Sequence, residues 1–167
     1  MHKLKPITID AVPAALVKAE RYRLIGDPSG AESICLDVLA VDPSNQQAVS
    51  TLLLAITDQM DDGLAEGVMR AREVLPQITD EYRRQYYSGI ICERRAKAQL
   101  KRGGPRCHEI SSEWLREAME HYERAESVRP PGNDDALLRW NTCARILMRN
   151  PDLRPRGHEE FEPVIED

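Results

Sequence analysis

The side chains best suited to chemistry in this sequence are four cysteines and four histidines. No two cysteines form a C-x-x-C pair, the spacing that zinc sites and redox motifs use. Cys107 and His108 are adjacent, but without a second pair at metal-ligand spacing they make a weak zinc site. Cys35, Cys92 and Cys143 fall within helical patterns, where a free cysteine packs as a small hydrophobic residue. We therefore expect no metal, no cofactor and no catalysis; an enzyme would require distant residues to meet in a pocket.

Length and composition indicate one ordinary globular domain. The chain has 167 residues, a net charge of −5, and hydrophobic and charged contents of 41% and 31%, which suit a packed core with a charged surface. The first ten residues, MHKLKPITID, lack the apolar run of a signal peptide, and the longest apolar run, LLLAI at 52–56, is too short to span a bilayer. We expect a cytoplasmic protein without a membrane partner.

Three stretches share one spacing of small and apolar residues that ends in proline. They are AESICLDVLAVDP (31–43), LAEGVMRAREVLP (64–76) and AMEHYERAESVRP (118–130). In each, a small or aliphatic residue is followed four positions later by an apolar or aromatic residue, then three later by another, and five later by proline. This spacing places the three residues on one face of a helix, and the proline predicts where the helix ends.

Start and stop signals divide the whole chain into helices. Ser44 with Gln47 forms a capping-box pattern, and Ser112 is a candidate cap further on. Gly103-Gly104-Pro105 cannot continue a helix, so we expect a long loop at 102–112. No segment shows the alternation of a strand, which predicts an all-α protein. The expected helices lie at about 10–25, 28–41, 44–60, 63–75, 79–101, 112–128 and 134–149.

The proline spacing resembles that of the tetratricopeptide repeat (TPR) family. Pro43 and Pro76 are 33 residues apart, and Pro76 and Pro130 are 54 apart, so the third unit carries extra residues. Helical pairs that recur at 33 or 34 residues are typical of stacked arrays. The resemblance covers about three degenerate repeats over residues 11–149, and GDPSGAESICLDVLAVDP (26–43) and WLREAMEHYERAESVRP (114–130) match best. Tyr22 fits an aromatic site of the family pattern, and Gly89 its close-packing glycine.

This resemblance implies an α-solenoid of stacked antiparallel hairpins with a C-terminal capping helix. The repeat domain would occupy 11–150, after an N-terminal extension at 1–10 and before an acidic tail at 151–167. The first helix of each pair would line a concave groove that binds a peptide or protein segment. The groove residues implied are Leu16, Glu20, Arg23, Val49, Leu53, Arg83, Tyr86, Tyr87, Ile90 and Arg94, with Ile56 on the same apolar stripe as Val49 and Leu53.

The alternative for these groove residues is that they pack against adjacent helices, because an error of one residue in register would turn them into the core. Some family members bind acidic C-terminal peptides through a clamp of lysines, arginines and asparagines. Here Leu16 and Glu20 stand where that clamp needs lysine and asparagine, and only Arg83 stands where it needs a cation. The residues therefore argue against that particular function.

Charge is uneven along the chain. Residues 81–106 hold eight basic and two acidic side chains, and residues 151–167 hold six acids and two arginines. A basic helix can contact phosphates, but the chain as a whole is acidic and no groove-reading motif appears, which argues against nucleic acid. The tail carries Phe161, Val164 and Ile165 among its carboxylates. It is either a solvated end or a segment that docks in a groove, which would allow self-association.

The sequence thus favours a protein–protein interaction module without catalysis, whose partner is an unknown protein or peptide. A chaperone for a secreted or assembling subunit is the alternative, and it would require an apolar surface for its client. A nucleic-acid-associated protein and an enzyme are the remaining, weaker hypotheses.

Overall fold

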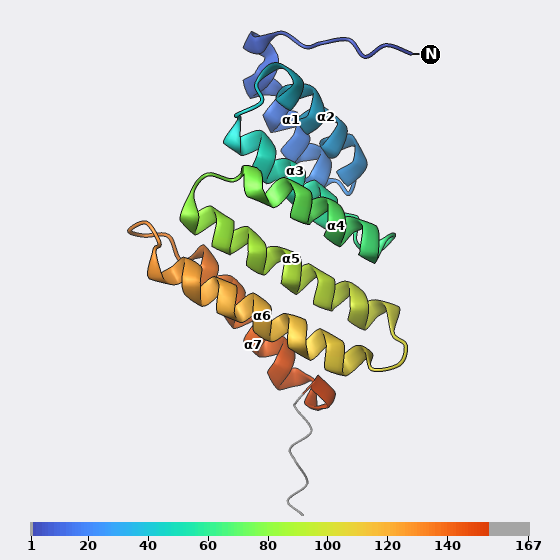
Figure 1. The fold of residues 1–167 in the computed structure, drawn as a ribbon, viewed down its shortest axis with the longest axis vertical. Helices are drawn as coiled ribbons and strands as arrows, with labels where there is room; N and C mark the ends of the chain where they lie inside the picture. The colour runs from blue at the N-terminus through green and yellow to red at the C-terminus, as the bar shows by residue number, and fades with distance from the viewer. Residues whose placement is uncertain (1, 154–167) are drawn as a thin grey trace, which may run out of the picture.

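The computed structural model describes residues 2–153 (Figure 1), which form seven α-helices and no strand. The predicted all-α class is confirmed. Within the same residues, no helix combines the length and apolar character needed to cross a bilayer. The helices are α1 Val12–Leu24, α2 Pro28–Val41, α3 Gln46–Asp58, α4 Leu64–Val74, α5 Glu81–Arg102, α6 Cys107–Ser127 and α7 Asp135–Arg149, with short 3-10 turns at Ile9–Ala11, Leu75–Gln77 and Pro151–Leu153.

Side-chain caps begin three of the helices. Asp27 accepts a hydrogen bond from the Gly30 amide at 2.9 Å at the start of α2, and Asp80 caps α5 in the same way. The cap of α3 is Asn45, which accepts from the Ala48 amide at 2.8 Å, and not Ser44 as the capping-box pattern predicted. Each satisfies an amide that the first turn of a helix leaves without a partner.

The helix ends follow the prolines as predicted. Pro43 and Pro130 lie beyond the last residues of α2 and α6, and Pro76 lies in the 3-10 turn that follows α4. Gly103 and Gly104 both lie outside any helix. The predicted loop at 102–112 is wrong, because α6 already begins at Cys107 and the connection is only 103–106. Positive φ values at Gly103, Gly104 and Arg106 turn the chain within these four residues.

Ser112 does not cap a helix. It lies inside α6, where its hydroxyl donates to the backbone carbonyl of Leu153 at 2.6 Å. Leu153 itself is fully buried. Residues as far as Leu153, the last one described, therefore pack with the helices. Phe161, Val164 and Ile165 lie outside the described residues.

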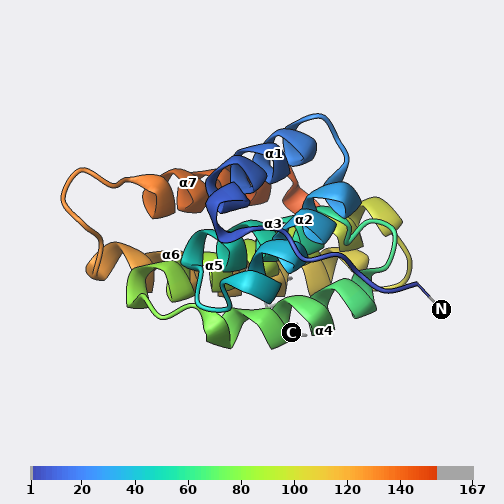
Figure 2. The same ribbon diagram turned by 90° about the horizontal axis from the view of Figure 1, so that it is seen from above.

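The helices pack in sequence order down the long axis of the molecule (Figure 1). The interface of α5 with α6 is the most extensive, and α3 also contacts α1 and α5. Seen from above, α1 and α7 lie toward one side and α4 toward the other (Figure 2). The residues with the repeated spacing are all buried except Leu64, which packs at the edge of the core: Ala31, Cys35, Val38, Val68, Ala71, Ala118, Tyr122 and Ala125.

Two main groups of buried side chains share α5. One is built by α1 to α4 together with Ile91 and Ala98 of α5. The other is built by α6, α7 and Leu153 together with Tyr82, Cys92 and Ala96 of α5. Because α5 contributes different faces to the two groups, it is the element that joins the two halves of the molecule.

Candidate functional site

Four of the residues expected to line a groove lie in the core. Leu16, Val49, Leu53 and Ile90 have exposed fractions of 4%, 1%, 0% and 0%, so their side chains are not accessible to a partner, and Ile56 is buried with them. For Val49, Leu53 and Ile56 the reason is that α3 packs against α1, α2, α4 and α5, whereas Leu16 of α1 packs with Val38 and Ala48. The neighbouring helices therefore cover the apolar side chains of α3 that were expected to face an open groove.

The other six predicted residues are polar or aromatic and reach the surface. Glu20 and Arg83 are exposed, whereas Arg23, Tyr86, Tyr87 and Arg94 are partly buried. The accessible part of the expected groove is therefore charged and aromatic rather than apolar.

Ion pairs link this surface across three helices. Arg23 of α1 contacts Asp58 of α3, with 2.7 Å between Nε and Oδ2. Arg94 of α5 pairs with the other oxygen of the same carboxylate. These three side chains have exposed fractions of only 19–23%, so the pairs are partly shielded from solvent.

A second set of charges joins α5 to α7. The carboxylate of Glu93 is fully buried and accepts from the Tyr122 hydroxyl at 2.7 Å. Its other oxygen lies 3.3 Å from a guanidinium nitrogen of Arg139 and also pairs with Lys97. We refer to the two sets together as the charged row: Arg23, Asp58, Glu93, Arg94, Lys97 and Arg139.

The cations of the charged row act on one another. Burial, together with the positive charges of Arg23 and Arg139, lowers the pKa of Arg94 to about 10. Burial also lowers the pKa of Arg23. Both guanidinium groups remain charged at neutral pH, although they are partly buried and lie near other positive charges. An added carboxylate would be stabilised there.

Tyrosines border the charged row on α5. The rings of Tyr86 and Tyr87 meet edge to face with centroids 5.2 Å apart. Tyr86 packs with the α6–α7 group of buried side chains and Tyr87 with the α1–α4 group, so the two consecutive side chains point in different directions. Both rings are partly exposed and offer flat apolar surface beside the cations.

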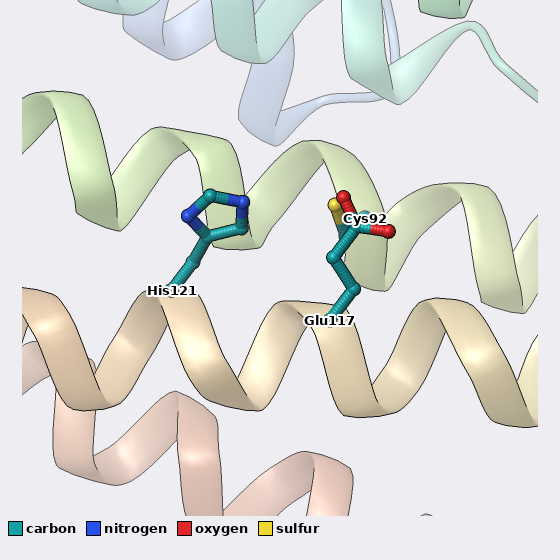
Figure 3. A group of neighbouring side chains, drawn as sticks. All are labelled: Cys92, Glu117 and His121. Atoms are coloured by element: carbon teal, nitrogen blue, oxygen red, sulfur yellow. The ribbon is translucent and has the colours of Figure 1, made fainter.

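A separate cluster of three potential ligands lies between α5 and α6. The sulfur of Cys92, a carboxylate oxygen of Glu117 and a ring nitrogen of His121 all lie within 4.8 Å of one another. Figure 3 shows the Glu117 carboxylate beside the Cys92 sulfur and the His121 ring turned along α6 toward them. Among residues 2–153 this is the one group of three or more such side chains close enough to share a metal ion.

The pair singled out in the sequence, Cys107 and His108, does not gain a third ligand among the described residues. Cys107 is 9% exposed at the start of α6, and its sulfur lies 3.7 Å from Nδ1 of His108. Both residues line an open pocket at the α5–α6 turn.

Sequence reasoning missed Asp58, Glu93, Arg139 and the three-residue cluster. Asp58 and Arg139 lie outside the positions that the repeat pattern marks, and Cys92 is far from Glu117 and His121 in the chain. A signal for half of the cluster was present, because Glu117 and His121 are four residues apart and therefore share one face of a helix.

Comparison with known proteins adds no assignment. No family model, no curated protein and no solved structure matches this chain.

Proposed function

We propose that this protein is a non-catalytic interaction module that binds an acidic segment of a partner protein. In this proposal α1–α2, α3–α4 and α5–α6 are TPR-like hairpins of a short solenoid, and α7 is its capping helix. The partner segment lies across α1, α3, α5 and α7. Contacts of α3 with both α1 and α5, and the ion pairs that run from α1 to α3 and α5, support this arrangement. A cytoplasmic location belongs to the same proposal.

The observation that carries this function is the charge balance of the charged row. Its four cations, Arg23, Arg94, Lys97 and Arg139, outnumber the carboxylates around them. These are Asp58 and Glu93, which form ion pairs, and Glu20, which also acts on Arg23. A partner carboxylate can restore the balance with charge-assisted hydrogen bonds, which are stronger than neutral ones. The exposed edges of Tyr86 and Tyr87 provide a surface for an apolar side chain of the same segment.

An apolar client fits this surface less well. The chaperone alternative needs accessible apolar side chains in the groove, but the apolar residues expected there, Val49, Leu53 and Ile90, are buried. Nucleic acid also fits less well, because the chain as a whole has a net charge of −5. Outside the charged row, Arg84, Lys101 and Arg106 of the basic stretch at 81–106 each pair with a carboxylate of the fold. An acidic protein segment therefore accounts for the surface better than an apolar client or a nucleic acid.

The test is fluorescence anisotropy with labelled peptides rich in Glu and Asp that also carry one aromatic residue. We expect saturable binding that weakens as salt rises, because salt screens charge–charge attraction. Replacing each Glu and Asp by Gln and Asn in the peptide should abolish it. Arg94→Gln and Arg139→Gln should each weaken binding by about tenfold, because each removes a charge-assisted hydrogen bond.

Two controls sharpen this experiment. Arg149→Gln removes an exposed charge from the last turn of α7, outside the charged row, and should leave the affinity unchanged. The second control is a chain that ends at Leu153. It lacks the carboxylates of residues 154–167, so these cannot compete with the added peptide. Equal binding of the acidic and the amide peptides, or equal loss in Arg149→Gln and Arg94→Gln, would contradict the proposed function.

A further inference from the structure

We propose that Cys92, Glu117 and His121 form a zinc site that ties α5 to α6. Thiolate sulfur, imidazole nitrogen and carboxylate oxygen are the three ligand types that zinc uses in proteins. The combination of sulfur and nitrogen ligands favours zinc over magnesium and calcium, which prefer oxygen alone. This inference does not depend on the proposed peptide binding, because these three side chains are not part of the charged row.

The positions of the ligands suit a single ion. The three ligand atoms lie within 4.8 Å of one another, and zinc–ligand bonds are about 2.0–2.3 Å long, so small side-chain rotations bring all three onto one centre. Glu117 and His121 lie one turn apart on α6, and Cys92 faces them from α5 (Figure 3). Three protein ligands leave a fourth tetrahedral position for water.

The imidazole of His121 is already oriented for this role. Its Nδ1 lies 2.9 Å from the amide oxygen Oε1 of Gln85. An amide oxygen only accepts hydrogen bonds, so Nδ1 carries the proton and Nε2 keeps its lone pair. A histidine ligand in a metal site is usually held by such a hydrogen bond from its second nitrogen. A ring that donates from Nδ1 in this way presents the lone pair of Nε2, which is the form of imidazole that binds a metal.

Charges of both signs surround the cluster, and a divalent ion would have to outweigh the repulsion of nearby arginines. A Cys92 thiolate and the Glu117 carboxylate together carry two negative charges, which one zinc ion neutralises. Arg72 and Arg95 are the cations that act on Cys92. Arg95 lies over the Trp114 ring, 3.7 Å from its centroid, and Arg72 lies 6.0 Å from the same centroid. The competing state without metal is a Cys92 thiol that donates a hydrogen bond to Glu117.

Cobalt(II) titration of the reduced full chain tests the site, since cobalt replaces zinc and reports sulfur ligation by absorption. We expect one ion per chain, a thiolate-to-cobalt charge-transfer band, and displacement of the cobalt by zinc. The band should be lost in Cys92→Ala. Cys143→Ala is the matched control, because Cys143 is equally buried but lies outside the cluster, and it should keep the band.

If Cys92→Ala does not fold, variants that keep Cys92 test whether the cluster binds zinc. His121→Gln and Glu117→Gln should lower the affinity for zinc by at least about tenfold, whereas His108→Gln should not change it. Gln85→Ala removes only the partner that orients His121, and should weaken binding by about 10–100-fold. Stoichiometric zinc should also raise the melting temperature of the wild type and not that of His121→Gln.

Three outcomes would overturn the proposal. They are the absence of stoichiometric binding, a cobalt spectrum that persists in Cys92→Ala, and a spectrum that is lost in Cys107→Ala or His108→Gln instead. The last would place the ion at the start of α6.

Discussion

Gly89 lies in α5 directly against the ring of Tyr122 in α6. A Cβ atom added to Gly89 would stand 2.4 Å from a ring carbon of Tyr122, and that ring has no exposed surface, so it has no free space to move into. We predict that Gly89→Ala lowers the free energy of unfolding by about 1–3 kcal/mol, because overpacking outweighs the better helix propensity of alanine.

The control for this prediction is Gly63→Ala. No atom lies within 4 Å of the Cβ that Gly63 would gain, so there is no overpacking. Because Gly63 is the N-cap of α4, chemical denaturation should show only the capping cost of alanine, at most about 1 kcal/mol. If both substitutions have the same small effect, the helices are not closely packed at Gly89. The family resemblance suggested that Gly89 is a close-packing glycine. The sequence could not show that the side chain packed against it is Tyr122.

The hydroxyl of Tyr122 is the buried donor to Glu93, at 2.7 Å. Tyr122→Phe keeps the packing of the ring but removes that donor from a fully buried carboxylate. We predict a loss of about 1–3 kcal/mol in the free energy of unfolding, the cost of an unmet buried hydrogen bond. Urea denaturation measures it, with Ser127→Ala as the control, since the Ser127 hydroxyl bonds only an exposed carbonyl of its own helix. Equal stabilities of the two variants would count against the role of Tyr122.

At the scale of the elements, local signals located the helices but not every boundary. Pro43, Pro76 and Pro130 act on their own backbone, so their positions predicted the helix ends. The sequence prediction placed the start of α6 too late. Gly103-Gly104-Pro105 indicates where α5 ends, but it does not indicate how short the connection to α6 is. Ser112 matched a cap by residue type, but its hydroxyl bonds the carbonyl of Leu153, a tertiary partner that no local pattern reveals.

The turn at Pro151–Leu153 is held to α6 by one apolar and one polar contact. Leu153 is fully buried against the α6–α7 group of side chains, and its carbonyl accepts from Ser112 at 2.6 Å. We predict that Leu153→Ala lowers the free energy of unfolding by about 2–5 kcal/mol through the cavity it leaves. A chain that ends at Asp152 should be less stable than one that ends at Leu153 by as much as Leu153→Ala lowers the stability of the full chain. Thermal denaturation that shows no difference within either pair of chains would contradict this anchoring.

The whole molecule explains why four of the residues expected to line a groove are buried instead. Periodicity identifies the apolar face of a helix but not how many neighbours cover it. Because α3 lies against four other helices, Val49 and Leu53 are interior, while Arg23 and Arg94 remain at the surface and meet at Asp58. Cys92 likewise meets Glu117 and His121 only because α5 packs against α6. A sequence pattern does not show which residue of α5 lies opposite which residue of α6.

The two groups of buried side chains make a prediction about how the molecule opens. The interface between α5 and α6 is much larger than those of α5 with α3 and α4, so the weakest junction lies between α4 and α5. Parts of a protein that share few contacts can open separately. We predict that Leu53→Ala, in the α1–α4 group, speeds amide hydrogen exchange in α1 to α4 much more than in α6. Leu115→Ala, equally buried in α6, should instead speed exchange in α5, α6 and α7. Uniform acceleration across residues 12–149 by either substitution would show that α5 couples the two halves into one cooperative unit.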